Sequence, residues 1–185
     1  MLKNSSNSYG LLAILLHWSM AVLILVLFIL GLYMTALTYY DPNYRVSFFW
    51  HESLGMLTLL LLALRYLWRI FNVLPVHELT VPVWQENSAR LVHWLFYILI
   101  ALICVSGYLI STAEGQAVNV WNLVEVPAVS SFEEGFANSA GVIHWYAAIV
   151  VLALTMVHTL AALFHHIVLK DNVLNSIIKG VKHEK

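Results

Sequence analysis

Four long apolar segments dominate this chain of 185 residues. Each is about as long as, or longer than, the roughly 20 residues that a helix needs to cross a bilayer. The segments are Leu11–Leu37, Phe48–Phe71, Leu91–Ser111 and Ala140–Leu169. Only 10% of the residues are charged, compared with about 25% in soluble domains. Because backbone groups in lipid must be hydrogen-bonded internally, we predict an all-α, integral-membrane four-helix bundle that forms a single domain over residues 1–185.

The distribution of lysine and arginine predicts the orientation of this bundle, because these residues favour cytoplasmic loops. The first and third loops hold only Arg45. All other basic residues lie in the N-terminus, the second loop, the C-terminal tail or the adjoining helix ends. They are Lys3, Arg65, Arg69, Arg90, Lys170, Lys179, Lys182 and Lys185. We therefore expect both termini to lie in the cytoplasm.

Six histidines lie on or beside the apolar segments, where an imidazole is costly and suggests a function. They are His17, His51, His93, His144, His158 and His165. His144 and His158 share one helix face and are about 21 Å apart along the helix axis. His51 opens the second segment at the depth of His144, and His17 lies at the depth of His158. The spacing thus predicts two histidine pairs at two depths.

His144 and His158 are 14 residues apart, and a step of 14 residues from the histidine of another segment likewise leads from one depth to the other. On the first and third segments it reaches Gly31 and Gly107. Glycines at these positions make room for a bulky cofactor, although close helix packing explains a membrane glycine equally well. From His51 the step reaches Arg65, whose guanidinium can pair with carboxylates. We therefore expect Gly31, Gly107 and Arg65 to contribute to cofactor binding.

Facing imidazoles without acids or thiolates are typical of one kind of metal centre. Zinc and di-iron sites use carboxylates or clustered ligands, whereas Glu52 is the only acid at an end of these segments. Cys104 is the only cysteine, which excludes a disulfide and the Cys-x-x-Cys-His attachment of covalently bound haem. Two imidazoles are one of the axial ligand sets of b-type haem. We therefore predict two b haems, with the axial ligands His17, His51, His144 and His158.

His93 and His165 each have two interpretations. His93 shares the inner level with His17 and His158, so three histidines compete there for two axial positions. A hydrogen bond from His93 to a haem propionate or a quinone is favoured over ligation. His165 lies at the inner end of the fourth segment, where it could transfer protons to a quinone, since histidine titrates near neutral pH. The alternative for His165 is an interfacial histidine whose ring reaches the aqueous phase.

In their order and spacing these motifs resemble the prokaryotic cytochrome b561 family over nearly the whole chain. The motifs are His17-Trp18, His51-Glu-Ser-Leu-Gly55, Arg65-x-x-x-Arg69, His144, His158-x-x-Ala-Ala-Leu-x-His165-His166 and Lys170-Asp171-Asn172. The resemblance implies a dihaem protein of the bacterial inner membrane that exchanges electrons with ubiquinone. It also implies that His17 and His158 bind one haem and that His51 and His144 bind the other.

The outer electron partner has two candidates. The resemblance implies a quinone-linked oxidoreductase, and one activity of the family is the oxidation of periplasmic superoxide. Superoxide is an anion that cationic residues would attract. The third loop, however, carries four acids and no basic residue, namely Glu114, Glu125, Glu133 and Glu134. This charge favours the alternative, a haem-carrying membrane anchor and electron conduit for a separate dehydrogenase or a periplasmic redox protein.

One further class of function, a transporter, is less well supported by the sequence. A transporter of protons or metal ions would need acids along a path through the membrane, and apart from Glu52 at one end the apolar segments have none. It would also leave the two separate levels of histidines unexplained. We expect the lipid bilayer and ubiquinone as partners and no nucleic acid.

Overall fold

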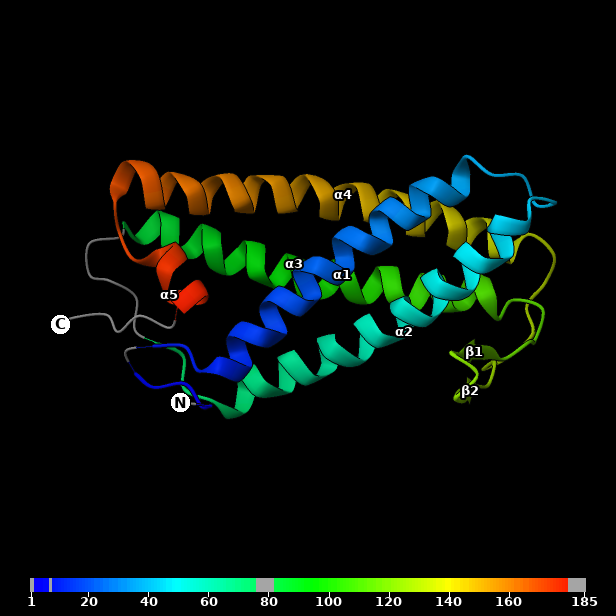
Figure 1. The fold of residues 1–185 in the computed structure, drawn as a ribbon, viewed down its shortest axis with the longest axis horizontal. Coiled ribbons are helices and arrows are strands. Elements are labelled where there is room, and N and C mark those ends of the chain that lie inside the picture. Colours follow the sequence, from blue (N-terminus) through cyan, green and yellow to red (C-terminus); the bar gives the residue numbers. More distant parts are fainter. Residues whose placement is uncertain (1, 7, 76–81, 180–185) are drawn as a thin grey trace. The chain divides into compact units, whose positions relative to one another are not determined.

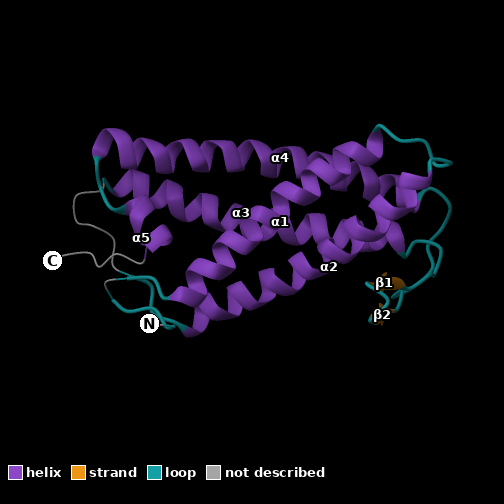
Figure 2. Cartoon of the chain, in the orientation of Figure 1, coloured by secondary structure: helices purple, strands orange, loops and turns teal. Residues whose placement is uncertain are grey.

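A computed structural model describes residues 2–6, 8–75 and 82–179 of the chain. Helices make up most of it (Figures 1 and 2). They are α1 (Leu11–Thr35), α2 (Pro42–Phe71), α3 (Val83–Ser111), α4 (Phe136–Phe164) and the short α5 (Val173–Lys179). The first four are long and apolar enough to cross a membrane, which confirms the predicted four-helix transmembrane fold. The orientation stays a prediction, and two residues that support it, Lys182 and Lys185, lie outside the described residues.

Three helices begin earlier than the apolar segments indicated. The expected starts were Phe48, Leu91 and Ala140, and the observed starts are Pro42, Val83 and Phe136. The hydropathy pattern detects the apolar part of a helix, which lies in the hydrocarbon core of the membrane. It misses the polar turns that continue the helix beyond that part. Pro42, which lies before the expected start at Phe48, is therefore part of the helix. Proline is well suited to a first helical position, and the Asp41 carboxylate caps this end by accepting the Asn43 N–H at 2.8 Å.

The structure divides into two compact units, and each includes a part of all four long helices. The unit that we call the terminal unit comprises Met1–Ser19, Ala63–Ile98 and Val150–Lys185. The other, which we call the hairpin unit, comprises Met20–Leu62 and Leu99–Ile149. The predicted histidines of the inner level all belong to the terminal unit, and those of the outer level belong to the hairpin unit.

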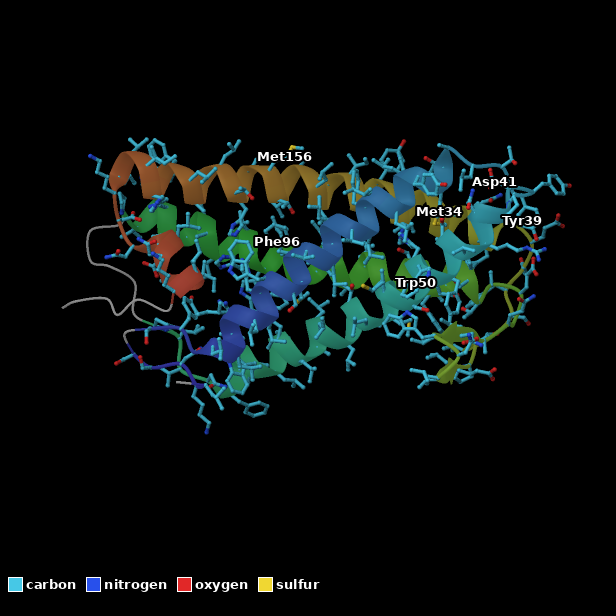
Figure 3. The ribbon with its side chains drawn as sticks, in the orientation of Figure 1. Met34, Tyr39, Asp41, Trp50, Phe96 and Met156 are labelled. Atoms are coloured by element: carbon cyan, nitrogen blue, oxygen red, sulfur yellow. The ribbon has the colours of Figure 1, made fainter. Side chains whose placement is uncertain are left out.

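Large apolar side chains remain exposed along the long helices. Figure 3 shows Met156 pointing outward from α4, and 57% of this residue is exposed. Comparable side chains on the other helices include Val22, Leu60 and Ile98. Apolar exposure of this extent is unfavourable in water and favourable in lipid. The exterior of the helices thus agrees with a membrane location.

The loop between α3 and α4 contains a β-hairpin. Its strands β1 (Val118–Val120) and β2 (Val124–Val126) pair antiparallel, and Val118 is fully buried. At the turn, Trp121 and Asn122 have φ values of 49° and 58°, which tight hairpins require but a tryptophan rarely adopts. The Trp121 N–H donates to Ser53 Oγ on α2 at 3.2 Å. The loop is therefore anchored to the helix that carries His51.

The end of α4 leads into a second local structure that the sequence did not predict. A π-helical turn, His165–Leu169, is followed by Lys170 in a left-handed conformation with φ 54°. The chain then reverses into α5, where the Trp18 indole N–H of α1 donates to the Ile177 carbonyl at 3.0 Å. This contact holds the start of α1 and the end of the described chain together within the terminal unit.

Candidate metal centres

The structure brings the four predicted ligand histidines together as two pairs. In the hairpin unit, the ring centres of His51 and His144 are 6.1 Å apart and the ring planes make an angle of 64°. In the terminal unit, the ring centres of His17 and His158 are 6.5 Å apart with the same interplanar angle. All four residues are half-buried. These are the pairings that helical spacing predicted.

The distance within each pair suits a metal ion held between two imidazoles. Two metal–nitrogen bonds of about 2.0 Å, each extended by about 1.1 Å to the ring centre, separate the centres by about 6.2 Å. The observed distances of 6.1 and 6.5 Å agree with this value. Within the described ranges, no group of three or more His, Cys, Asp or Glu side chains is arranged to hold a metal ion. The pairs therefore fit an axial role in which a macrocycle supplies the remaining ligands, as haem does.

His144 has a defined hydrogen-bond environment. Its Nδ1 lies 2.9 Å from the Ile103 carbonyl oxygen and 3.2 Å from Ser106 Oγ, both on α3. A carbonyl only accepts hydrogen bonds, so Nδ1 carries the proton and Nε2 keeps its lone pair. This is the tautomer that a metal-binding histidine needs, with its other nitrogen bonded to the protein.

His51 lies in a different environment. Its Nδ1 is buried and has no hydrogen-bond partner among the described residues. On α1, a Cβ added to Gly31 would lie 3.3 Å from His51 Cε1. On α3, a Cβ added to Gly107 would lie 3.1 Å from His144 Cε1. The structure thus places both predicted glycines against the imidazoles of this pair.

His158 has a third histidine nearby in the terminal unit. The His93 and His158 ring centres are 5.6 Å apart, and Phe96 lies at the same distance from His158. Figure 3 labels Phe96 on α3. The separation of His93 from His158 is shorter than the about 6.2 Å that two metal–nitrogen bonds require. The geometry thus suits His17 better than His93 as the partner of His158.

Cationic side chains lie near the histidine pair of the terminal unit. Arg65 is half-buried and close enough to act electrostatically on His17 and His158. Burial raises the pKa of Tyr9 above its usual 10.0, while Arg69 and Arg65 lower it by a smaller amount. Tyr9 is therefore a neutral hydroxyl group close to two cations.

His165 forms a pair that sequence reasoning missed. Its Nδ1 lies 2.5 Å from Asp171 Oδ2, and the side chains are 15% and 12% exposed. Residues six positions apart lie on different faces of a regular α-helix. The π-helical turn and the left-handed Lys170 bring Asp171 back to His165. The Lys170-Asp171-Asn172 motif was the available signal, although spacing alone did not connect it to His165.

The loop between α3 and α4 presents an acidic surface. All four of its glutamates are exposed, and the one lysine or arginine of the hairpin unit is Arg45, which lies in the first turn of α2 rather than in a loop. The four are Glu114, Glu125, Glu133 and Glu134. Among them stand exposed apolar side chains, including Leu123 and Val129.

Comparison with known proteins adds three findings. Residues 8–180 match the family described as prokaryotic cytochrome b561. Over 175 residues the chain is 34% identical to "Cytochrome b561 homolog 2" of Escherichia coli (strain K12), an alignment that covers 95% of this chain and 93% of that protein. It is 27% identical over 175 residues to the "Probable superoxide oxidase CybB" of Yersinia pestis, with coverages of 91% and 94%.

Proposed function

This chain belongs to the prokaryotic cytochrome b561 family, and from that premise we propose that it passes electrons through two b-type haems between a periplasmic donor and ubiquinone. Family and fold make it a multi-pass protein of the inner membrane that binds haem b and takes part in electron transport. The observation that carries the proposal is the pair of matched imidazole distances, 6.1 and 6.5 Å, in two separate units.

The proposed axial ligands are His51 and His144 for one haem and His17 and His158 for the other. When bound, each haem iron accepts and releases one electron. The hydrogen bond from His144 Nδ1–H to the Ile103 carbonyl would leave Nε2 of this histidine available to bind the iron. His93 is proposed to donate a hydrogen bond to a haem carboxylate or a quinone, because its distance to His158 is short for ligation. Arg65 is proposed to pair with a haem carboxylate.

The quinone is proposed to bind near His165. Reduction of ubiquinone to ubiquinol takes up two electrons and two protons. Because His165 Nδ1 faces the Asp171 carboxylate, Nε2 is the atom left to exchange protons. Asp171 would stabilise the imidazolium that forms after proton uptake from the aqueous phase. With both termini in the cytoplasm, as the basic residues predict, these protons come from the cytoplasm.

The outer electron donor has two candidates. The name of the Yersinia relative suggests superoxide, and two superoxide anions would each give one electron and leave as oxygen. The second candidate is a protein donor that this chain serves as a membrane anchor and electron conduit. The four exposed glutamates support the second candidate, because they repel an anion and attract a basic protein surface.

A reduced-minus-oxidised spectrum with a haem count on the purified protein tests the proposal. We expect two b haems for each chain, and a protein without haem would refute it. Stopped-flow mixing with superoxide, with and without ubiquinone, then separates the two donors. Rapid haem reduction followed by quinone-dependent reoxidation supports superoxide. If the haems stay oxidised with superoxide but accept electrons from a co-purified redox protein, the conduit is supported.

A further inference from the structure

Three groups of α3 surround the imidazole of His144, although α3 supplies no histidine to that pair. The one histidine of α3, His93, belongs to the terminal unit. The Ile103 carbonyl and the Ser106 hydroxyl lie 2.9 and 3.2 Å from His144 Nδ1. The Gly107 backbone lies along the adjacent ring edge, where a Cβ would be 3.1 Å from Cε1.

The polar groups form a closed triangle of hydrogen bonds. The Ser106 hydroxyl donates to the Ile103 carbonyl at 3.0 Å. Its oxygen is then free to accept from the His144 Nδ1–H, which also donates to the same carbonyl. Ser106 is only 4% exposed, so little water competes for these bonds. The His144 N–H therefore has two protein acceptors in fixed positions.

The partner imidazole lacks this support. His51 Nδ1 is buried without a hydrogen-bond partner among the described residues, and the Gly31 backbone lies against its ring edge. A histidine whose Nδ1–H is bonded to an acceptor gives more electron density to a metal than one whose Nδ1–H is not. The two imidazoles of this pair thus differ in the hydrogen bonding of Nδ1.

We propose that Ser106, the Ile103 carbonyl and Gly107 are positioning groups that set the donor strength and ring rotation of His144. This inference rests on the proposed haem ligation by His51 and His144. Of the two histidines that would hold that haem, His144 is hydrogen-bonded at Nδ1, and His51 Nδ1 has no partner among the described residues. Stronger donation stabilises the ferric state, so the α3 groups lower the reduction potential of this haem. Gly107 then makes room for the edge of the His144 imidazole, whereas its helical position predicted that it makes room for a cofactor.

The test combines potentiometry with low-temperature EPR of the ferric protein. Ser106→Ala removes one acceptor, so we expect a higher potential for the His51–His144 haem and an unchanged potential for the His17–His158 haem. Ser106→Thr retains a hydroxyl and should restore the wild-type value. Gly107→Ala should shift the EPR g-values of the same haem, because its methyl group displaces the ring. Gly141→Ala is the matched control, since nothing lies within 4 Å of its Cβ position.

The outcomes separate this inference from the function on which it rests. If His144→Ala keeps both haems, the proposed ligation is wrong. If His144→Ala loses one haem, but Ser106→Ala leaves the potential of that haem unchanged or lower and Gly107→Ala leaves its g-values unchanged, the inference about α3 is overturned. If Ser106→Ala loses only the haem of His51 and His144, and Gly141→Ala retains both haems, the positioning role is supported.

Discussion

Asp171 Oδ2 lies 2.5 Å from His165 Nδ1, at the point where the π-helical turn ends and the chain reverses toward α5. The contact joins a carboxylate and an imidazole that are both largely shielded from solvent. Such a pair fixes the tautomer of the imidazole and leaves one nitrogen available for proton exchange. This geometry is consistent with the proposed role of His165 as a proton donor to a quinone.

Asp171→Asn is expected to slow ubiquinol formation while both haems remain bound. Loss of an oriented acid or base lowers rates by roughly 100-fold or more where proton transfer limits the reaction. The measurement is quinone reduction by protein whose haems have been reduced beforehand. His166→Ala serves as the control because His166 is exposed and adjacent to His165. Equal rates in Asp171→Asn and wild type would remove this pair from the mechanism.

His158→Ala and His144→Ala are each expected to reduce the haem content from two to one per chain. The imidazole distances imply that the haem lost differs between these variants. A haem count and the absorption spectrum measure this directly. His93→Ala is the informative comparison and should retain both haems. If His93→Ala loses a haem and His17→Ala does not, His93 is the partner of His158.

Reversing the charge of the acidic loop is expected to accelerate the reaction with superoxide. Replacing Glu133 and Glu134 by lysine converts a repulsive surface into an attractive one, and the gain should shrink as salt is added. Stopped-flow haem reduction at several ionic strengths measures the effect. Glu86→Lys, in the terminal unit, is the control. Because Glu86→Lys changes the net charge by half as much, an effect of half the size in the control would show that overall net charge, rather than this loop, governs the rate.

Ser53→Ala is expected to loosen the β-hairpin. It leaves the Trp121 N–H without its acceptor, which costs about 1–3 kcal/mol where the donor stays buried. Trp121 also has a left-handed backbone that is unfavourable for its side chain. Limited proteolysis between α3 and α4 should therefore become faster. Ser130→Ala, at an exposed position of the same loop, should be cleaved at the wild-type rate.

Alkaline stability should depend on Tyr9. The folded chain keeps the Tyr9 proton to a higher pH than the unfolded chain, because burial raises the pKa of this phenol above 10.0. Its stabilising effect is complete below that value and is lost as the pH rises through the raised pKa. Tyr9→Phe should therefore show a smaller loss of stability in alkali, measured by denaturant unfolding. Tyr40→Phe, at an exposed site, should behave like the wild type.

The transmembrane helices and histidine pairings could be predicted because each depends on a regular pattern. Hydropathy persists over the whole length of a membrane helix, and the 3.6-residue period determines which side chains share a face. That period related His144 to His158 and led to His17 and His51 as their partners. The same regularity explains why Gly31 and Gly107 were identified, although the groups that they contact were not.

The features that were missed depend on local irregularity. The Asp171–His165 contact needs a π-helical turn and a left-handed lysine, neither of which has a periodic signature. The hairpin turn carries Trp121 and Asn122 at positions where glycine is common, and a glycine there would have indicated the turn. The early start of α2 depends on capping by Asp41, which lies beyond the apolar segment. In each case, side-chain hydrogen bonds determine a conformation that hydropathy does not reflect.

Each compact unit is assembled from several separate stretches of the chain, and every long helix is cut by the boundary between the units. Neither unit is therefore a continuous piece of sequence: a segment that carries the hairpin unit also carries residues 63–98 of the terminal unit, and a segment that carries the terminal unit carries the whole hairpin unit. A deletion within α4 between His144 and His158 would likewise move one of these histidines out of register with its partner on another helix. The two histidine pairs are thus nested in the sequence: a segment from His51 to His144 carries one pair alone, whereas any segment from His17 to His158 carries both.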